Sequence, residues 1–319
     1  MIRTVLGDVD PADLGVTFAH EHLLMTGDWP VMDEPDFRLD SVDSAVEEIA
    51  PARAAGLSAV VEMTPLGFGR SPRGLAEISR RTGVHVVAVT GFHKVGYYSD
   101  RHWLHRYSAE QIAGLLAAEI EQGMDEHGLV GPLLDRTAAR AGAVKIGTGY
   151  HRFGRSVGKL IEAAGIVHAR TGVPVTTHTD QGTGGHELLD ALARAGVPGE
   201  KVVLGHIDHN PDPGYLAELA ARGAWLAFDM PGRVKYAPDS QSVTLIAALH
   251  ERGHSGRLLL GSDLARRSYW RSLGGGPGLD YLLTRFVPRL TAAGLGEVVK
   301  RALVTNPARA FSLGAGEER

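Results

Sequence analysis

The feature that most constrains the fold is an alternation of short apolar runs with longer helical segments. Between the runs lie stretches whose apolar residues recur with the period of a helix, and several of these stretches end at glycine, as helices often do. This alternation is typical of repeated βα units around a parallel sheet. Eight runs rich in β-branched and apolar residues occur at 16–23, 58–64, 84–92, 141–148, 173–179, 201–207, 224–230 and 256–263.

Eight such units predict a closed (β/α)8 TIM barrel. A doubly wound open sheet is the alternative, but it would more often carry a glycine-rich phosphate-binding turn after its first strand, and HEHLLMTG at 20–27 is not one. Because α/β barrels routinely use a length of 319 residues as one domain, we expect residues 1–319 to form a single domain.

The C-terminal part of the chain is longer than a minimal barrel needs. Residues 264–286 exceed an ordinary barrel loop, so we expect them to form a lid over the C-terminal face of the barrel. Residues 294–313 regain helical character, and we expect two short terminal helices, the second starting at Asn306 and Pro307.

Composition narrows the class of partner. The net charge of -4 provides no basic surface for nucleic acid, and no segment is long and apolar enough for a membrane helix, so a small molecule is the expected partner. The chain has no cysteine, which excludes disulfides and thiolate ligands. The N-terminus lacks an apolar signal core behind a basic start, and a cytoplasmic enzyme is the simplest interpretation.

Ligand-type side chains lie at or near the C-terminal ends of the predicted strands. In a barrel those ends converge on one mouth, where active sites lie. Two histidines separated by one residue on a strand face the same side, so both can reach one metal ion. A lone pair of this kind is weak evidence, but six such residues at the ends of five strands are harder to dismiss. The six residues are His20, His22, Lys145, His178, His206 and Asp263.

Lys145 is the least expected member, because it lies in a strand whose other neighbours are apolar or small. It can pair with a buried carboxylate or extend to the barrel mouth. Alternatively, its neutral amine has reacted with carbon dioxide to form a carbamate, which has the charge and two oxygens of a carboxylate and can bridge two cations. A low-dielectric site favours the neutral amine that this reaction needs.

Each remaining residue also has an ordinary structural explanation. His178 and His206 can be hydrogen-bonded core histidines, and Asp263 can be a helix N-cap. None of these explanations accounts for the whole set. Histidine, carboxylate and carbamate ligands suit zinc, manganese, cobalt or iron, with zinc favoured.

The chain resembles the phosphotriesterase-like branch of the amidohydrolase superfamily. The matching segments run in the family's order from the first strand to the last helix: HEHL at 20–23, VKIGT at 144–148, PVTTHT at 174–179, GHID at 205–208, GSD at 261–263 and NPARAF at 306–311. The resemblance implies that His20, His22 and Asp263 bind one divalent metal ion and that His178 and His206 bind a second. It further implies that a carboxylated Lys145 and a hydroxide bridge the two ions.

Two departures from the family's pattern concern the substrate. Phosphotriesterase-type members have an Asp after the sixth strand's motif and a His after the seventh strand's Asp, whereas His209 and Met230 stand at those places. The loops after strands seven and eight look like those of the subgroup that hydrolyses phosphorylated sugar lactones. In that subgroup a Lys, an Arg and a Tyr bind the substrate phosphate, and Lys235, Arg266 and Tyr269 match their spacing.

The chemistry of these three residues suits a phosphate, since Lys offers a point charge, Arg a planar fork and Tyr a hydroxyl. The alternative is that the charges near the mouth are ordinary solvated loop residues. Tyr98, next to Tyr97 after the third strand, is expected to touch the lactone ring or carbonyl; general aromatic lining of a pocket is equally compatible.

The expected reaction is opening of a lactone, of a phosphorylated furanose sugar, by a metal-bridging hydroxide, with Asp263 both ligand and general base. The alternatives are an N-acyl-homoserine lactonase, a phosphotriesterase acting on organophosphates, and a catalytically silent barrel that acts as a binding protein. The resemblance also implies a homodimer.

Overall fold

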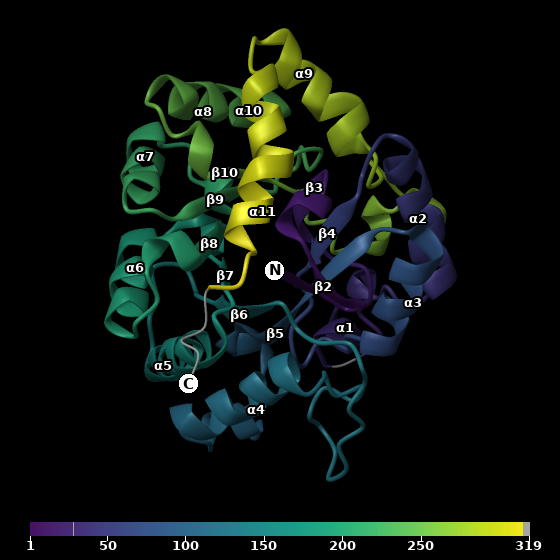
Figure 1. Cartoon of the computed structure of the whole chain (residues 1–319), viewed down its shortest axis with the longest axis vertical. Helices are drawn as coiled ribbons and strands as arrows, with labels where there is room; N and C mark the ends of the chain where they lie inside the picture. Colours follow the sequence, from purple (N-terminus) through teal and green to yellow (C-terminus); the bar gives the residue numbers. More distant parts are fainter. Residues whose placement is uncertain (28, 315–319) are drawn as a thin grey trace.

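The computed structural model of the chain describes residues 1–27 and 29–314. Eight parallel strands form one sheet in sequence order, and Figure 1 shows them in the centre of the molecule with the helices around them. Seven of these strands fall within the apolar runs, and β5 extends two residues beyond its run, 84–92. The strands are β3 (Thr17–Glu21), β4 (Ala59–Glu62), β5 (His85–Lys94), β6 (Ala143–Gly147), β7 (Val175–His178), β8 (Val202–Gly205), β9 (Trp225–Phe228) and β10 (Leu258–Leu260).

The first and last strands meet, which closes the sheet into a barrel. The backbone N–H of Asp263, just after β10, donates to the carbonyl of His20 on β3 at 3.0 Å. The buried carboxylate of Glu21 accepts from the backbone N–H of Ser262 at 2.7 Å and from that of Leu264 at 3.4 Å. The predicted (β/α)8 barrel is therefore confirmed.

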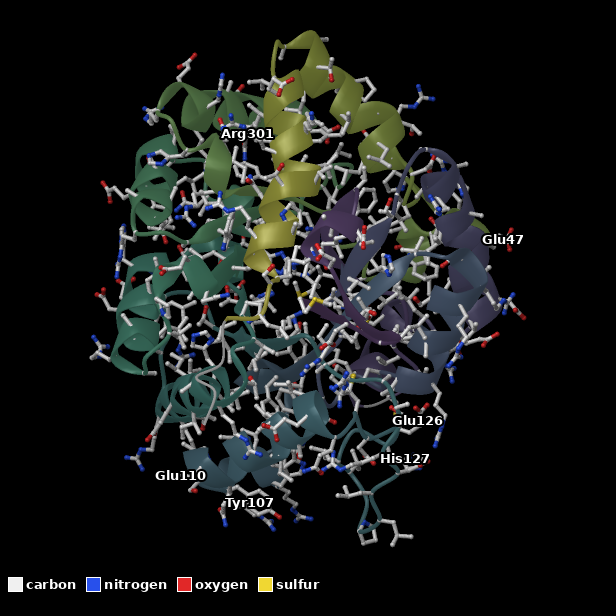
Figure 2. All side chains as sticks on the ribbon, viewed as in Figure 1. Glu47, Tyr107, Glu110, Glu126, His127 and Arg301 are labelled. Atoms are coloured by element: carbon white, nitrogen blue, oxygen red, sulfur yellow. The ribbon has the colours of Figure 1, made fainter. Side chains whose placement is uncertain are left out.

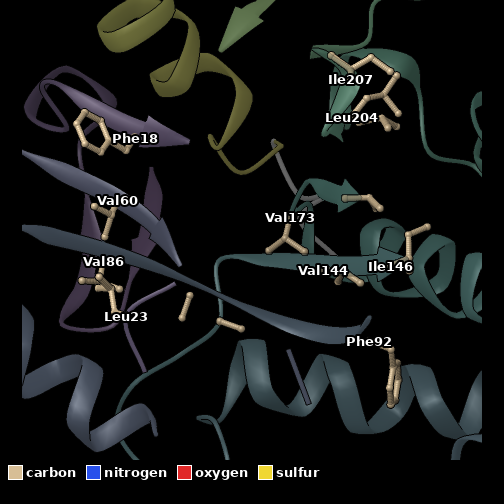
Figure 3. Packing of buried hydrophobic residues seen from close by; sticks show 14 of the residues in the cluster. Phe18, Leu23, Val60, Val86, Phe92, Val144, Ile146, Val173, Leu204 and Ile207 are labelled. Atoms are coloured by element: carbon tan, nitrogen blue, oxygen red, sulfur yellow. The ribbon is translucent and has the colours of Figure 1, made fainter. Parts of the chain in front are cut away.

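Alternate residues of the strands face opposite sides of the barrel wall, as the two-residue period of a strand requires. Phe18, Val60 and Val86 are register partners on β3, β4 and β5, and Figure 3 shows them in the packing against the outer helices. Their neighbours in sequence include Val61 and Val87, which belong to a separate, smaller apolar cluster. That cluster fills the barrel interior.

In the described part of the chain, seven helices from α2 to α8 surround the barrel, and their ends follow from local sequence. Ser41, Ser71 and Ser108 each accept a backbone N–H at a helix start, and Gly83 and Gly172 end helices in the left-handed conformation. The outer faces carry charged residues such as Glu47 and Glu110 (Figure 2). The helices are α2 (Val42–Ala54), α3 (Pro72–Thr82), α4 (Ala109–Glu121), α5 (Arg155–Thr171), α6 (Gly185–Arg194), α7 (Pro213–Ala221) and α8 (Asp239–Glu251).

The two ends of the chain cover the barrel opposite the strands' C-terminal ends. A hairpin of β1 (Ile2–Thr4) and β2 (Gly7–Val9) precedes β3. Ile2 and Phe311 pack in the interior cluster with Trp225, the first residue of β9. Leu313 also donates its N–H to the carbonyl of Met1 at 3.0 Å. The termini therefore close the bottom of the barrel and leave its mouth open for a site.

The loop after β10 runs from 261 to 280 with two short 3-10 turns, Arg267–Tyr269 and Arg271–Leu273, and helical structure begins at Tyr281. Helix α1 (Trp29–Asp33) lies in the loop after β3. Trp270 of the loop after β10 is buried, and its indole N–H donates to the carbonyl of Leu264 at 2.9 Å. The loop is therefore fixed to the barrel, and its residues at the mouth belong to the site below.

The prediction of two separate terminal helices is wrong in one respect. Helix α11 (Asn306–Ala310) begins where predicted, but α10 (Gly296–Lys300) joins it through a π-helical turn at Arg301–Thr305. A second π-helical turn, Leu282–Phe286, precedes α9 (Val287–Ala292) in the same way. In both, proline is the second residue after the turn. Since proline lacks an N–H and crowds the preceding turn, a widened turn lets the helix continue.

Among the described residues, no helix is long and apolar enough to cross a membrane.

Candidate active site

The six predicted ligands come together at the C-terminal ends of the strands. His22, Lys145, His178, His206 and Asp263 line one cavity of about 210 Å³ at the barrel mouth. His20 is buried next to it, with its ring centre 4.7 Å from that of His206. Lys145 pairs with Thr176 in the β6–β7 register and His178 with Gly205 in the β7–β8 register, so successive strands carry the ligands around the mouth.

The two histidines of β3 reach the same carboxylate, as expected for residues two apart on a strand. Nε2 of His20 lies 3.6 Å from Oδ1 of Asp263, and Nε2 of His22 lies 3.4 Å from the same oxygen. One ligand atom from each of the three residues can be chosen so that all lie within 4.8 Å of one another. The ligand types and spacing of this group suit one of the two ion positions in the predicted metal site.

His22 is oriented from behind by a hydroxyl group. Its Nδ1 lies 2.8 Å from Oγ1 of Thr64, and this hydroxyl donates to the carboxylate of Glu62. Because the hydroxyl donates its hydrogen to Glu62, it accepts from Nδ1–H of His22. The proton on Nδ1 leaves Nε2 free to bind a metal ion. Burial raises the pKa of Glu62 to about 7, although the hydrogen bonds from Thr64 oppose this rise.

Asp229, which follows β9, holds two more histidines. Its Oδ1 lies 2.8 Å from Nδ1 of His206, and its Oδ2 lies 2.9 Å from Nδ1 of His20. Burial alone would raise the pKa of Asp229, but His206 and His20 outweigh burial and hold this pKa well below its usual value. Both oxygens lie next to imidazole nitrogens, which is the position of a carboxylate that orients the histidine ligands of a metal site.

Arg233, four residues further on, contacts both carboxylates of the site. Its Nη1 donates to Oδ2 of Asp263 at 2.7 Å, and its Nη2 donates to the carbonyl of Asp229 at 2.8 Å. Burial alone would raise the pKa of Asp263, but Arg233 and then His20 outweigh it and hold this pKa well below its usual value. Asp263 is thus kept as a carboxylate.

Lys145 is fully buried on β6, and its Nζ donates to the carbonyl of Met63 at 2.7 Å. Burial lowers the pKa of Lys145 to about 8, although Asp263 and Glu62 oppose this change. Among the described residues, no carboxylate lies within ion-pair distance of its Nζ. The alternative of a pairing with a buried carboxylate is therefore not observed, and burial shifts the amine of Lys145 toward its neutral form.

His178 provides the sharpest test of whether the site fits metal ions. Both of its ring nitrogens are buried and have no hydrogen-bond partner among the described residues. Its ring centre lies 4.5 Å from that of His206, and burial holds its pKa well below the usual value. A buried imidazole without a partner is costly in an apoprotein but is the form that binds a metal ion. The residues present therefore fit a metal centre.

The backbone at two of the ligands is strained. His206 has a φ of 58° and Asp263 a φ of 46°, in the left-handed region that residues other than glycine rarely adopt. Gln181, which also lines the cavity, has a φ of 54°. Each such residue costs about 1–3 kcal/mol, and such strain gathers at functional sites.

The predicted phosphate-binding residues lie at the rim of the same cavity. Arg266 and Tyr269 line it, and the hydroxyl of Tyr269 is buried without a hydrogen-bond partner. Lys235 is exposed, with its Nζ 5.2 Å from the centre of the Tyr269 ring. Arg266 stacks on Phe37, 4.4 Å from the ring centre. The structure thus brings all three residues together.

Tyr98 is placed differently from what the sequence suggested. Its side chain is buried, and its hydroxyl donates to the carbonyl of Leu66 at 2.7 Å and accepts from the N–H of His93 at 2.9 Å. It does not line the cavity, whereas its neighbour Tyr97 does. The contact with substrate expected of Tyr98 is therefore better assigned to Tyr97, because Tyr98 supports the loop after β5.

Sequence reasoning did not single out His93, Asp229 or Arg233 as site residues. His93 lines the cavity, with its ring centre 4.5 Å from that of His178. His93 and Asp229 stand at the ends of β5 and β9, so the strand-end signal that found the six ligands could also have found them. Arg233 lies in a loop, and no sequence signal distinguishes it from the solvated charges around it.

Comparison with known proteins identifies the family of the chain. The model of the phosphotriesterase family matches residues 1–311. A phospho-furanose lactonase from Mycoplasmopsis synoviae (strain 53) is 36% identical, covering 97% of this chain and 91% of that protein.

Two solved structures are also similar. A lactonase from Listeria monocytogenes has a TM-score of 0.91 at 30% identity, covering 98% of this chain and 99% of that one. A phosphotriesterase homology protein from Escherichia coli, complexed with phosphate in its active site, has a TM-score of 0.86 at 32% identity, covering 95% of this chain and 100% of that one. The chain is a hydrolase that belongs to the phosphotriesterase family.

Proposed function

We propose that the protein is a binuclear metal-dependent lactonase that opens the ring of a phosphorylated furanose lactone. The observation that carries this proposal is a single cavity that joins the ligand cluster to Arg266 and to the unpartnered hydroxyl of Tyr269. The lactonase and phospho-furanose lactonase relatives support the reaction class. The phosphate in the active site of the Escherichia coli relative supports an anionic group at this mouth.

The ligand residues would hold the two metal ions as a set. His20, His22 and Asp263 form the first group, with His22 and Asp263 facing the cavity. His178 and His206 form the second, and a carboxylated Lys145 would connect the two. Two bound divalent ions would acidify a water molecule and polarise the lactone carbonyl.

Asp263 is placed to handle the proton of the reaction. Its pKa is held well below the usual value, so it enters the reaction as a carboxylate. It accepts the proton that the attacking water loses, and it returns this proton to the ring oxygen when the C–O bond of the lactone breaks. The sum of the two steps adds one water molecule to the ring.

The rim residues would bind the phosphate. Tyr269 offers a hydroxyl whose hydrogen is not already donated, and Lys235 beside it offers an exposed ammonium. Arg266 offers its guanidinium, although it is already within 3.3 Å of Glu34 and 3.4 Å of Asp36. These two carboxylates fix the direction of the Arg266 guanidinium and offset part of its positive charge. Lys235 and Tyr269 should therefore contribute more than Arg266 to the preference for phosphorylated over unphosphorylated lactones.

The test is a panel of γ-lactones in matched pairs with and without a phosphate, together with an acyl-homoserine lactone and an organophosphate triester. We expect the phosphorylated lactones to have the highest kcat/KM. In Tyr269→Phe and Lys235→Met, the phosphorylated substrate should lose about 10-fold or more in kcat/KM per lost contact while its unphosphorylated partner changes little. Equal losses on both members of a pair would contradict the phosphate assignment.

Arg267→Ala provides a matched control. This residue follows Arg266 directly but does not line the cavity, and its Nη1 lies 3.8 Å from Asp40 instead. The variant removes one charge from the same loop and should leave the preference for phosphate unchanged. A preference that falls as much as in Lys235→Met would mean that only the general charge of the loop matters.

Asp263→Asn tests the reaction itself. The variant should lower kcat far more than it changes KM, because the amide cannot take the proton. Elemental analysis of the purified variant would show whether both metal ions remain. Full turnover with both metal ions retained would rule out the role of general base.

A further inference from the structure

An ion pair crosses the end of one barrel strand at the mouth. Nζ of Lys94, the last residue of β5, lies 3.2 Å from Oδ2 of Asp180, two residues after the end of β7. Strand β6 lies between these two strands and ends at Gly147, the register partner of Lys94 on one side and of His178 on the other. A Cβ atom on Gly147 would lie 2.4 Å from the backbone nitrogen of Lys94. The missing side chain therefore lets the chain at Lys94 come close to the end of β6, from where Lys94 reaches the loop after β7.

The pair belongs to the same cavity as the predicted metal ligands. Both Lys94 and Asp180 line it, and their side chains are 28% and 25% exposed. Within residues 1–27 and 29–314, the ammonium donates to Asp180 alone, and Oδ1 of Asp180 accepts no hydrogen bond. The pair therefore keeps free N–H donors and a free acceptor oxygen side by side. A hydroxyl group can use both at once, because it donates one hydrogen bond and accepts others.

Both side chains are held in place by their neighbours. Asp180 begins a tight turn, in which the N–H of Thr183 donates to the carbonyl of Asp180 at 3.1 Å. Gln181, the next residue of this turn, has the strained φ of 54°, and such strain gathers at functional sites. The ammonium of Lys94 lies 5.6 Å from the centre of the Tyr97 ring. A binding group that is already fixed loses little conformational entropy when a ligand arrives.

We propose that Lys94 and Asp180 bind the hydroxyl group on C2, the carbon next to the lactone carbonyl, and so make the enzyme prefer hydroxylated over deoxy sugar lactones. The carboxylate accepts the hydrogen of the hydroxyl group, and the ammonium donates to its oxygen. The inference rests on the proposed function, from which it takes the positions of the carbonyl and the phosphate.

The position of the pair in the barrel matches this hydroxyl group. Strand β6 is four strands away from β10 in either direction around the barrel, and the phosphate-binding Arg266 and Tyr269 follow β10. In a furanose lactone C4 carries the phosphate arm, and the two ring carbons that are not bonded to C4 are the carbonyl carbon and C2. With the phosphate on the side of β10 and the carbonyl at the predicted metal ligands, C2 lies on the side of β6.

The binding experiment uses anhydropentitol phosphates, which have the ring and the phosphate of the substrate but no carbonyl, so they cannot be hydrolysed. Calorimetry on the metal-loaded protein compares both C2 epimers with the ring that lacks the C2 hydroxyl. We expect the better epimer to have a Kd about 10-fold lower than the deoxy ring. This is the lower end for hydrogen bonds to charged groups, as suits a pair that is partly exposed.

The ratio of these two Kd values is the readout for the variants, because the loss of one charge changes the affinity for the phosphate equally in both rings. In Asp180→Ala and in Lys94→Met the ratio should fall to about one, since only the hydroxylated ring loses a contact. Asp180→Asn keeps an acceptor oxygen and should retain part of the preference. It also serves as the second variant if Asp180→Ala does not fold.

Asp190→Asn is the matched control. Asp190 lies on α6 and accepts from Arg222, so it is also a carboxylate in an ion pair, but it does not line the cavity. The variant should leave both Kd values unchanged. A fall in the ratio as large as that in Asp180→Ala would overturn the proposed site, because any lost carboxylate would then have the same effect.

Turnover of phosphorylated lactones with and without the C2 hydroxyl separates the two proposals. The kcat/KM ratio of the two lactones should fall in Asp180→Ala by the same factor as the Kd ratio, and comparison between variants removes the effect of the hydroxyl group on intrinsic reactivity. If the unaltered protein opens no lactone, the proposed function fails, whatever the rings show. If it opens lactones but binds neither ring, binds both equally, or loses both equally in Asp180→Ala and Lys94→Met, the hydroxyl site is overturned while the function stands.

Discussion

A threonine hydroxyl stands between a predicted metal ligand and a buried carboxyl group: Oγ1 of Thr64 lies 2.8 Å from Nδ1 of His22 and donates to Glu62. Both residues belong to the end of β4 or its loop, while His22 follows β3. The orientation of the His22 ring, which follows β3, is therefore set by residues at the end of the neighbouring strand, β4.

Replacing this hydroxyl should weaken metal binding without unfolding the barrel. In Thr64→Val the Nδ1 proton of His22 loses its acceptor, and loss of such an orienting partner costs about 10–100-fold in metal affinity. Competition with a chelator measures this affinity. Thr64→Ser keeps the hydroxyl and should behave nearly as the unaltered protein. Unchanged affinity in Thr64→Val would show that His22 needs no such support.

Removal of the Lys145 side chain should prevent the site from holding its metal ions. Lys145→Ala should lose metal ions and activity, because the proposed carbamate bridge is built on the Lys145 amine. Short carboxylic acids should partly restore both, since they supply the two oxygens of the proposed carbamate. Elemental analysis with and without acetate measures this. Full metal occupancy without added acid would refute a bridging carbamate.

Tyr98→Phe should lower the free energy of unfolding and leave kcat and KM nearly unchanged. The change leaves the buried carbonyl of Leu66 without its donor and the N–H of His93 without its acceptor, which costs roughly 1–3 kcal/mol of unfolding free energy. Urea denaturation measures the loss. Tyr97→Phe should instead change the kinetic parameters and leave the free energy of unfolding nearly unchanged, because Tyr97 lines the cavity. A large rise in KM for Tyr98→Phe at normal stability would restore the role expected from the sequence.

A buried ion pair should control the stability of the loop after α4. Arg70 donates to Glu119 on α4, and this carboxylate also accepts from Thr90 of β5 and from the N–H of Asp125. Arg70→Met leaves the carboxylate buried and unpaired, which costs about 3–5 kcal/mol.

Thermal and urea unfolding of Arg70→Met should be compared with the double variant Arg70→Met/Glu119→Gln. The amide keeps an acceptor for Asp125 and removes the charge, so part of the stability should return. The exposed pair of Arg73 with Asp135 is the control, and Arg73→Ala should have little effect. If the double variant is no more stable than Arg70→Met, an unpaired charge is not the cause.

The fold could be predicted well because the barrel repeats one physical pattern eight times. Each apolar run matches a strand, and the strand-end rule placed the six predicted ligands together at one barrel mouth. The rule succeeds because parallel strands in a barrel all end at the same mouth.

What the sequence could not provide is the partner of each side chain. Asp229 matters because it holds His20 and His206 from two other strands, and Arg233 matters because a loop folds it back onto Asp263. Tyr98 shows the same limit, since one residue of a Tyr–Tyr pair faces the cavity and the other faces the core. Such choices depend on loop geometry, and loops have no periodic sequence pattern from which it could be predicted.

The closure of the barrel between β3 and β10 has a consequence for how the protein matures. The proposed first metal group would draw two ligands from positions 20 and 22 and the third from position 263, so it spans most of the chain. During synthesis, the early histidines must wait until the last strand has emerged and docked. Metal uptake would therefore report completion of the barrel, and the ions would stabilise only chains whose two ends have already met.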